Sequence, residues 1–200
     1  MNPNTRDAIL DAAEALLGRL GYRKMTAEEI ARRAGVSRAS FYLYFPTKEE
    51  AVLATVDRTA DRVCDRLEEI AASDRSVPAR IREMLVARVM LRFDSARDDS
   101  QGPDDLLASI RSALLARRTR HFARESRIFR RVLEEGVRSG VLTRDSVPRT
   151  ARALLLATNS LLPESLGTRE PGSRRTVERE ARDIAELLVE GIVKRKRPAR

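Results

Sequence analysis

Apolar residues recur every three or four positions through most of the chain, with polar and charged residues between them. The longest unbroken example lies in residues 48–72, where the apolar positions are Val52, Val56, Ala60, Val63, Leu67 and Ile70. This spacing follows the turn of an α-helix, so each such segment places its apolar side chains on one face. No segment shows the strict alternation expected of a half-buried strand. The pattern predicts an all-α protein with about nine helices.

Cap residues, glycines and prolines divide this pattern into separate helices. Thr26 and Glu29 form a capping box at the start of one short helix, and Gly35 can adopt the left-handed conformation that ends it. Ser37 can cap a second short helix, and Thr47 can open a long one. We expect helices over residues 5–20, 27–34, 38–43, 48–72, 78–93, 103–118, 119–139, 146–162 and 174–193. A loop or a frayed short turn is expected over residues 94–102, and a loop over residues 167–173.

Residues 26–45 therefore hold two short helices joined by a tight turn that contains glycine. This arrangement is the helix-turn-helix pattern, whose second helix enters the major groove of DNA. Further residues stand at fixed spacing around it: Ile9-Leu10, Ala12-Ala13, Leu16-Leu17, Gly21, Thr26, Ile30-Ala31, Ala34-Gly35-Val36-Ser37, Phe41-Tyr42, Tyr44-Phe45 and Lys48-Glu49. At these residues the chain resembles the TetR (tetracycline-repressor-like) family of bacterial transcription regulators. The close match ends near Val63.

The resemblance implies two domains. Residues 3–63 would form the DNA-binding domain, with a three-helix head whose helix-turn-helix spans 26–45 and with the helix from residue 48 shared with the body. Residues 64–193 would form a ligand-binding and dimerisation domain. The run of basic residues over 194–200 indicates a disordered solubilising tail, which could instead add weak, salt-sensitive attraction to DNA. Of the net charge of +9, residues 1–48 hold eight Lys and Arg against five Asp and Glu. A basic head on a nearly neutral body favours a localised phosphate-binding face.

The second short helix carries residue types that recognise DNA. Arg38 can donate two parallel hydrogen bonds to guanine O6 and N7, or bind a phosphate. By the resemblance, the residues that contact DNA are Thr26, Ser37, Arg38, Ala39, Ser40, Tyr42, Tyr44 and Lys48. Thr26 also serves as a helix cap, and Lys48 would hold a phosphate at the start of the long helix. Ala39 stands where the family commonly has glycine, and Leu43 where it often has histidine, so the base contacts stay open.

The resemblance also implies a dimer interface and an effector cavity. In the family, the last two long helices of each subunit pack into a four-helix bundle with those of the partner subunit. Here the interface residues would be Ala151, Leu155, Thr158, Leu162, Ala181, Ile184 and Leu188. The cavity wall would include Met84, Arg88, Phe93, Phe122, Phe129 and Asn159, each of which could instead be plain core or surface. Such a lining favours a lipophilic or acyl-type effector, with Arg88 or Arg92 available for an anionic group.

The sequence gives no support for catalysis, a metal or a cofactor. The single histidine, His121, has no partnered nucleophile or carboxylate pattern, and no glycine-rich phosphate loop is present. Cys64 is the single cysteine, which excludes an intramolecular disulfide and fits a reducing compartment. No apolar run approaches the ~20 residues needed to cross a bilayer, and the N-terminus lacks a signal-peptide pattern. We therefore expect a cytoplasmic protein that is not an enzyme.

The leading hypothesis is a transcriptional regulator that binds a palindromic double-stranded DNA operator as a homodimer. It would act as a repressor and leave the operator when a small-molecule effector binds. Activation is the alternative within the family, because the position of the operator decides between them and is absent from the protein sequence. A helical interaction protein whose basic head binds a protein partner is the alternative from another class. A DNA-binding measurement distinguishes these classes.

Overall fold

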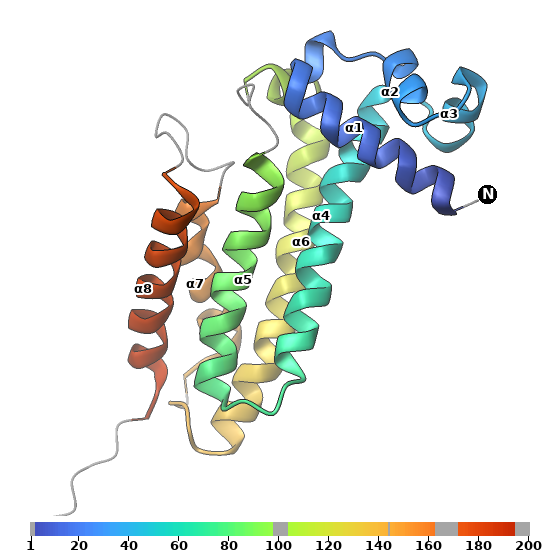
Figure 1. Cartoon of the computed structure of the whole chain (residues 1–200). Coiled ribbons are helices and arrows are strands. Elements are labelled where there is room, and N and C mark those ends of the chain that lie inside the picture. The colour runs from blue at the N-terminus through green and yellow to red at the C-terminus, as the bar shows by residue number, and fades with distance from the viewer. Residues whose placement is uncertain (1–2, 98–103, 144, 163–171, 195–200) are drawn as a thin grey trace, which may run out of the picture. The chain divides into compact units, whose positions relative to one another are not determined.

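The computed structural model describes residues 3–97, 104–143, 145–162 and 172–194, and within these ranges the chain forms eight α-helices (Figure 1). They are α1 (Pro3–Lys24), α2 (Ala27–Arg33), α3 (Arg38–Tyr44), α4 (Lys48–Ala71), α5 (Val77–Arg97), α6 (Asp104–Arg138), α7 (Val147–Thr158) and α8 (Arg174–Ile192). A turn of 3₁₀-helix, Asn159–Leu161, follows α7. In the described ranges there is no strand, only an isolated bridge between Leu142 and Val193. The predicted all-α fold class is confirmed.

The predicted break between residues 118 and 119 is wrong, since both segments belong to the single helix α6. No proline or glycine stands between Asp104 and Glu135 to interrupt it. The hydroxyl of Thr119 donates a hydrogen bond to the backbone carbonyl of Leu115 at 3.1 Å. The residue expected to open a new helix is therefore bonded to the turn before it.

Two predicted loops and the predicted tail lie partly outside the residues that the structure describes. The loop expected over residues 94–102 is wrong in its first part, because α5 continues to Arg97. Residues 98–102, most of the loop expected over 167–173, and residues 195–200 of the tail lie outside the described residues. None of the helices in the described part combines the length and apolar character needed to span a bilayer.

The chain divides into two compact units. Unit 1 is Met1–Asp61 with Asp94–Arg120, and unit 2 is Arg62–Phe93 with His121–Arg200. The sequence-based division at residues 63 and 64 placed all of α6 in the body, whereas unit 1 includes its first half. The physical reason is burial: Ile110 and Leu114 of α6 join the apolar core that α1–α3 and the start of α4 build.

In unit 1, a glycine interrupts α1 near its end, and ion pairs hold α1 against α4. Gly21 has a φ of 72°, a left-handed value that suits glycine, and it interrupts the helical backbone near the end of α1. Arg58 of α4 makes ion pairs with Asp11 at 2.8 Å and with Glu14 at 2.6 Å, both on α1. Because the Arg58 side chain is mostly buried, these pairs hold α1 against α4 more firmly than exposed pairs would.

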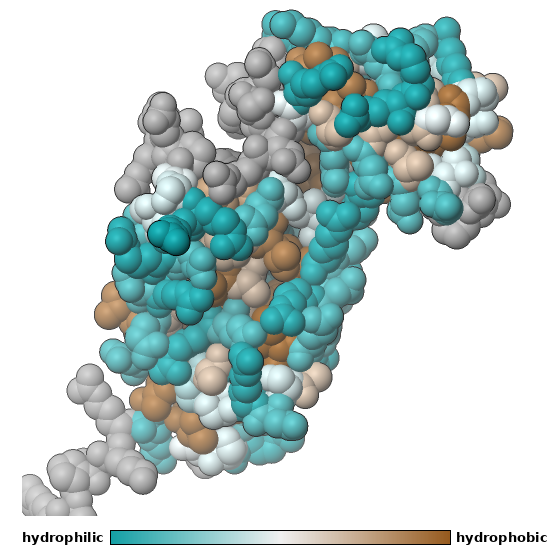
Figure 2. Space-filling view, viewed as in Figure 1, coloured by the Kyte–Doolittle hydropathy of each residue, from teal (hydrophilic) through white to brown (hydrophobic). Residues whose placement is uncertain are grey.

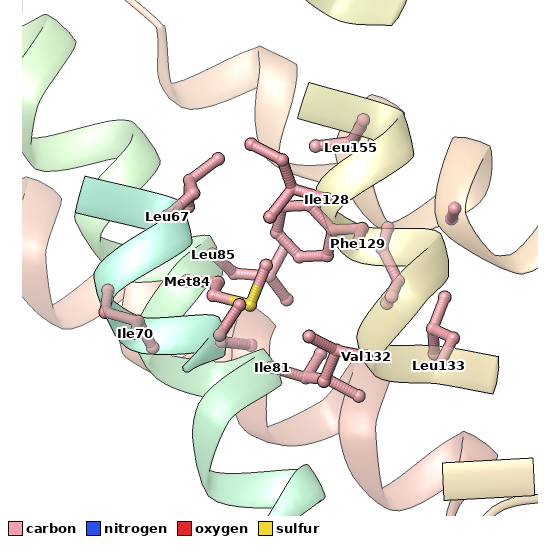
Figure 3. Close-up of a cluster of buried hydrophobic side chains, with 14 of the residues drawn as sticks. Leu67, Ile70, Ile81, Met84, Leu85, Ile128, Phe129, Val132, Leu133 and Leu155 are labelled. Atoms are coloured by element: carbon pink, nitrogen blue, oxygen red, sulfur yellow. The ribbon is translucent and has the colours of Figure 1, made fainter. Parts of the chain in front are cut away.

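The interior of unit 2 is built from apolar side chains of all its helices. Figure 3 shows these side chains converging from α4, α5, α6 and α7: Leu67, Ile70, Ile81, Met84, Leu85, Ile128, Phe129, Val132, Leu133 and Leu155. Cys64 is buried in the same cluster as a small apolar residue. Beside it α7 packs against α8, and the end of α8 is tied to the segment after α6. There the backbone N–H of Thr143 donates to the carbonyl of Ile192 at 2.9 Å.

Candidate nucleic-acid interface

The helix-turn-helix in unit 1 is fixed by its own polar residues. The Thr26 hydroxyl accepts a hydrogen bond from the backbone N–H of Glu29 at 3.2 Å, and the Glu29 carboxylate accepts from the backbone N–H of Thr26 at 2.9 Å. The predicted capping box is therefore confirmed. Gly35 makes the turn with a φ of 70°. The Ser37 hydroxyl accepts from the backbone N–H of Ser40 at 3.0 Å, which confirms the predicted start of α3.

Buried aromatic side chains in and just after α3 determine which side of the helix faces solvent. Phe41 and Phe45 are buried in the core of unit 1, so the opposite side of α3 must face solvent. Of the residues predicted to contact DNA, the exposed ones are Thr26, Ser37, Arg38, Ala39 and Tyr42, and the half-buried ones are Ser40, Tyr44 and Lys48. All eight side chains are thus at least partly accessible to solvent. Their contacts with DNA stay a prediction.

Arg38 is held by weak, exchangeable contacts. Its guanidinium forms an ion pair with Glu28 of α2 at 2.8 Å and lies over the Tyr42 ring, 5.7 Å from the centroid. More than half of the Arg38 side chain and half of that of Glu28 remain exposed. An exposed ion pair of this kind contributes little to stability, so the guanidinium can exchange it for a base edge or a phosphate.

Lys48 has a structural role that the sequence did not reveal. Its ammonium group donates to the backbone carbonyls of Tyr22 at 3.2 Å and Met25 at 3.1 Å, and it lies 4.4 Å from the centroid of the Tyr22 ring. The Tyr22 hydroxyl donates to the Glu49 carboxylate, and this hydrogen bond holds the pKa of Glu49 below its ordinary value. Lys48 therefore fastens the segment between α1 and α2 to the start of α4. Two of its three N–H donors are used in this way.

The residues predicted for an effector cavity pack inside unit 2. Met84 and Phe129 are fully buried in one apolar cluster, and Phe93 is buried in a second one with Leu161 and Leu162, which follow α7, and with residues of α8. Phe122 is half-buried and carries the guanidinium of Arg152 over its ring at 5.9 Å. These four side chains serve as core in this structure. Their role toward an effector stays a prediction.

The other two predicted cavity residues, Arg88 and Asn159, belong to a buried polar network. Arg88 donates to the Glu125 carboxylate through Nε, to the Thr158 hydroxyl at 3.0 Å, and to the Asn159 side-chain oxygen at 2.7 Å. Arg92 also donates to Glu125. Burial would by itself raise the pKa of Glu125, but Arg88 and Arg92 outweigh that effect and hold the pKa below its ordinary value. In the described part of the chain, no three His, Cys, Asp or Glu side chains converge as a metal site would require.

The residues predicted for the dimer interface face the interior of the chain itself. Ala151, Leu155, Thr158, Leu162 and Ala181 are buried within the single protomer. Ile184 and Leu188 are half-buried and pack against its apolar clusters. The five buried side chains are covered by their own chain, whereas Ile184 and Leu188 keep part of their surface accessible. A role of these residues in a dimer interface stays a prediction. The solvent-facing positions of α7 and α8 include Arg152, Ala153, Leu156, Asp183, Leu187, Glu190 and Gly191.

The fold and the geometry around α3 together define a helix-turn-helix protein. Residues 9–55 match the family model described as "Bacterial regulatory proteins, tetR family". The HTH-type transcriptional regulator BetI of Rhizobium meliloti is 36% identical over 94 residues, which are 47% of this chain and 45% of BetI. The matched stretch thus spans less than half the length of that relative.

Solved structures extend the likeness to most of the chain. A transcriptional regulator of the TetR/AcrR family from Thermobifida fusca superposes with a TM-score of 0.71 at 25% identity, covering 93% of this chain and 97% of that protein. SmeT of Stenotrophomonas maltophilia, in its complex with triclosan, gives a TM-score of 0.67 at 23% identity, with 95% and 92% covered. The chain is therefore similar to the TetR family of bacterial regulatory proteins, in sequence over residues 9–55 and in fold over most of its length.

Proposed function

We propose that this protein is a sequence-specific DNA-binding transcriptional regulator that acts in the cytoplasm as a repressor. The observation that carries the proposal is the outward face of α3. It holds a guanidinium, hydroxyls and a small residue on a short helix that Phe41 anchors from behind. The guanidinium and hydroxyl groups can donate to base edges and phosphates in the major groove, and the small residue allows a close approach. The family match over residues 9–55 covers this helix and its supports.

The regulator binds DNA as a two-fold homodimer, and the outward faces of α7 and α8 supply the interface. Leu187 has 71% of its surface exposed and Leu156 has 46%, which are high values for large apolar side chains in helices. Small residues lie beside them at helical spacing, Ala153 on α7 and Gly191 on α8. Apolar residues flanked by small ones permit the close approach of helices in a four-helix bundle.

A small-molecule effector binds in unit 2 and releases the protein from DNA. Two features support this part of the proposal. The structural relative SmeT was solved in complex with triclosan. The network of Arg88, Glu125 and Asn159 places polar groups inside an otherwise apolar interior, and such groups fix the orientation of bound ligands. An effector that enters here competes with Glu125 for Arg88, so one with an acidic or strongly hydrogen-bonding group fits best.

Selection from a pool of random-sequence duplexes tests the proposed function. The full-length protein should enrich a sequence with an inverted repeat, whose half-site centres are separated by about 34–36 Å or a multiple of it. Enrichment of such a repeat, with binding that weakens as salt rises, is the expected result. Recovery of unrelated sequences at every salt concentration would refute sequence-specific binding and favour a helical protein whose head binds another protein.

A further inference from the structure

The outermost side chain of α3 is apolar. Leu43 has 75% of its surface exposed, the highest value among the large apolar side chains of the described residues. Phe41, two positions earlier, has 0% exposed. At about 100° per residue, Ala39 and Leu43 each lie about 160° from Phe41 around the helix axis. The two residues are therefore neighbours, one turn apart, at the centre of the face that points away from the core.

Polar groups lie at the edges of this face rather than at its centre. On one side, Arg38 is drawn toward α2 by its ion pair with Glu28 and lies over the ring of Tyr42. On the other side, the hydroxyls of Ser37 and Ser40 are 2.9 Å apart and bond to each other. Figure 2 shows hydrophobic atoms among hydrophilic ones at the position of α3. An apolar strip thus runs between polar borders along the middle of the helix.

The chemistry of the major groove offers one matching group for such a strip. Thymine presents a C5-methyl group there, and the other three bases present only hydrogen-bonding atoms and ring carbons. An aliphatic side chain cannot donate to a phosphate, so a backbone contact would leave Leu43 without a favourable partner. Packing against a methyl group instead removes apolar surface of both partners from water.

We propose that Leu43, supported by Ala39, is a specificity-determining residue that selects thymine at one fixed position of each half-site. This inference rests on the proposed function, since it requires that α3 enter the major groove. Leu43 is not among the eight residues to which the resemblance assigns DNA contacts. Leu43 then reads one base at the centre of the strip, and the polar residues at its borders contact other base edges and phosphates.

Replacing thymine by uracil tests the proposal, because uracil lacks only the methyl group. Each thymine of the duplex selected from the random pool is replaced in turn by uracil, in both half-sites, and binding is measured with the wild-type protein. At one symmetric position the dissociation constant should rise about fourfold for each methyl group removed. The Leu43→Ala protein should bind the thymine and uracil duplexes at that position equally. Leu43→Met keeps a large apolar side chain and should restore the preference for thymine.

A matched control separates this effect from a general loss of stability. Leu115 of α6 is also an exposed leucine in unit 1, and Leu115→Ala should keep the full wild-type penalty for uracil. Because Leu43 is so exposed, Leu43→Ala should leave the thermal unfolding midpoint unchanged. Two results would overturn the inference: a wild-type protein insensitive to every uracil substitution, or a Leu43→Ala protein that keeps the penalty. If the pool yields no enriched duplex, the proposed function fails instead.

Discussion

Glu125 lies fully buried in unit 2 and accepts hydrogen bonds from Arg88 and Arg92. Replacing it with glutamine would leave two guanidinium groups in the interior without their carboxylate. Loss of one partner from a buried ion pair costs about 3–5 kcal/mol. We therefore expect Glu125→Gln to lower the free energy of unfolding by an amount in that range at pH 7, measured by urea denaturation. Glu68→Gln is the matched control, because Glu68 pairs with Arg131 and both side chains are exposed, so its effect should be small.

The ion pairs of Glu125 should also make the free energy of unfolding depend on pH. The folded-state pKa of Glu125 lies below the ordinary value of 4.5. Its contribution to stability is therefore fully present above about pH 4.5 and is lost as the pH falls through the folded-state pKa. Between pH 7 and pH 3 the wild-type protein should lose more stability than Glu125→Gln does. Equal losses, or a glutamine variant as stable as the wild type at pH 7, would show that the network does not stabilise unit 2.

Sequence patterns predicted some of these residues and missed others for identifiable reasons. The cap residues Thr26 and Ser37 were predicted correctly because capping depends on contacts within three residues. Glu125 was missed, although it occupies an inward position between Phe122 and Phe129 on the apolar stripe of α6. A charged residue on an apolar stripe is the signal that would have found it. The bonds of Lys48 to the carbonyls of Tyr22 and Met25 join residues more than twenty positions apart, which no local pattern encodes.

At the scale of helices, α8 has apolar residues on two faces, and the residues predicted for the dimer interface lie on or beside the inner one. Apolar residues at helical spacing occur on its inner face, at Val177, Ala181, Ala185 and Val189, and Leu187 stands on the outer face. Spacing shows that a helix is amphipathic but does not show whether its apolar side meets its own chain or a partner subunit. Only the burial of the inner set within one protomer separates the two surfaces.

Leu187 and Leu188 form a matched pair that tests the proposed interface. Leu187→Glu places a charge on the outer face of α8, where the protomer itself does not bury it. The variant should keep its thermal unfolding profile as a folded monomer and lose dimerisation in sedimentation experiments. Leu188→Glu places the charge against the apolar core of unit 2 and should destabilise the fold itself. If Leu187→Glu sediments as a dimer like the wild type, the outer face of α8 is not the interface.

At the scale of the whole molecule, the fold class and most helix boundaries follow from local signals, whereas the division into units does not. Helix starts at Ala27, Arg38 and Arg174 follow capping residues that the sequence displays. The assignment of the first half of α6 to unit 1 depends on where Ile110 and Leu114 are buried. That burial is set by contacts with α1 to α4, which are far away in the sequence. The periodic pattern identifies the buried side of α6 without identifying its neighbour.

The ratio of affinities for the selected duplex and for a scrambled duplex, measured at one salt concentration, tests most directly whether α3 reads DNA sequence. Arg38→Ala should weaken binding to the selected duplex by ~1–3 kcal/mol per half-site, about five- to 150-fold, and affect the scrambled duplex much less. Arg19→Ala removes the same charge from the exposed surface of α1 and should leave the ratio unchanged. An unchanged ratio in Arg38→Ala, or an equal loss of affinity for both duplexes, would contradict base recognition by Arg38 on α3.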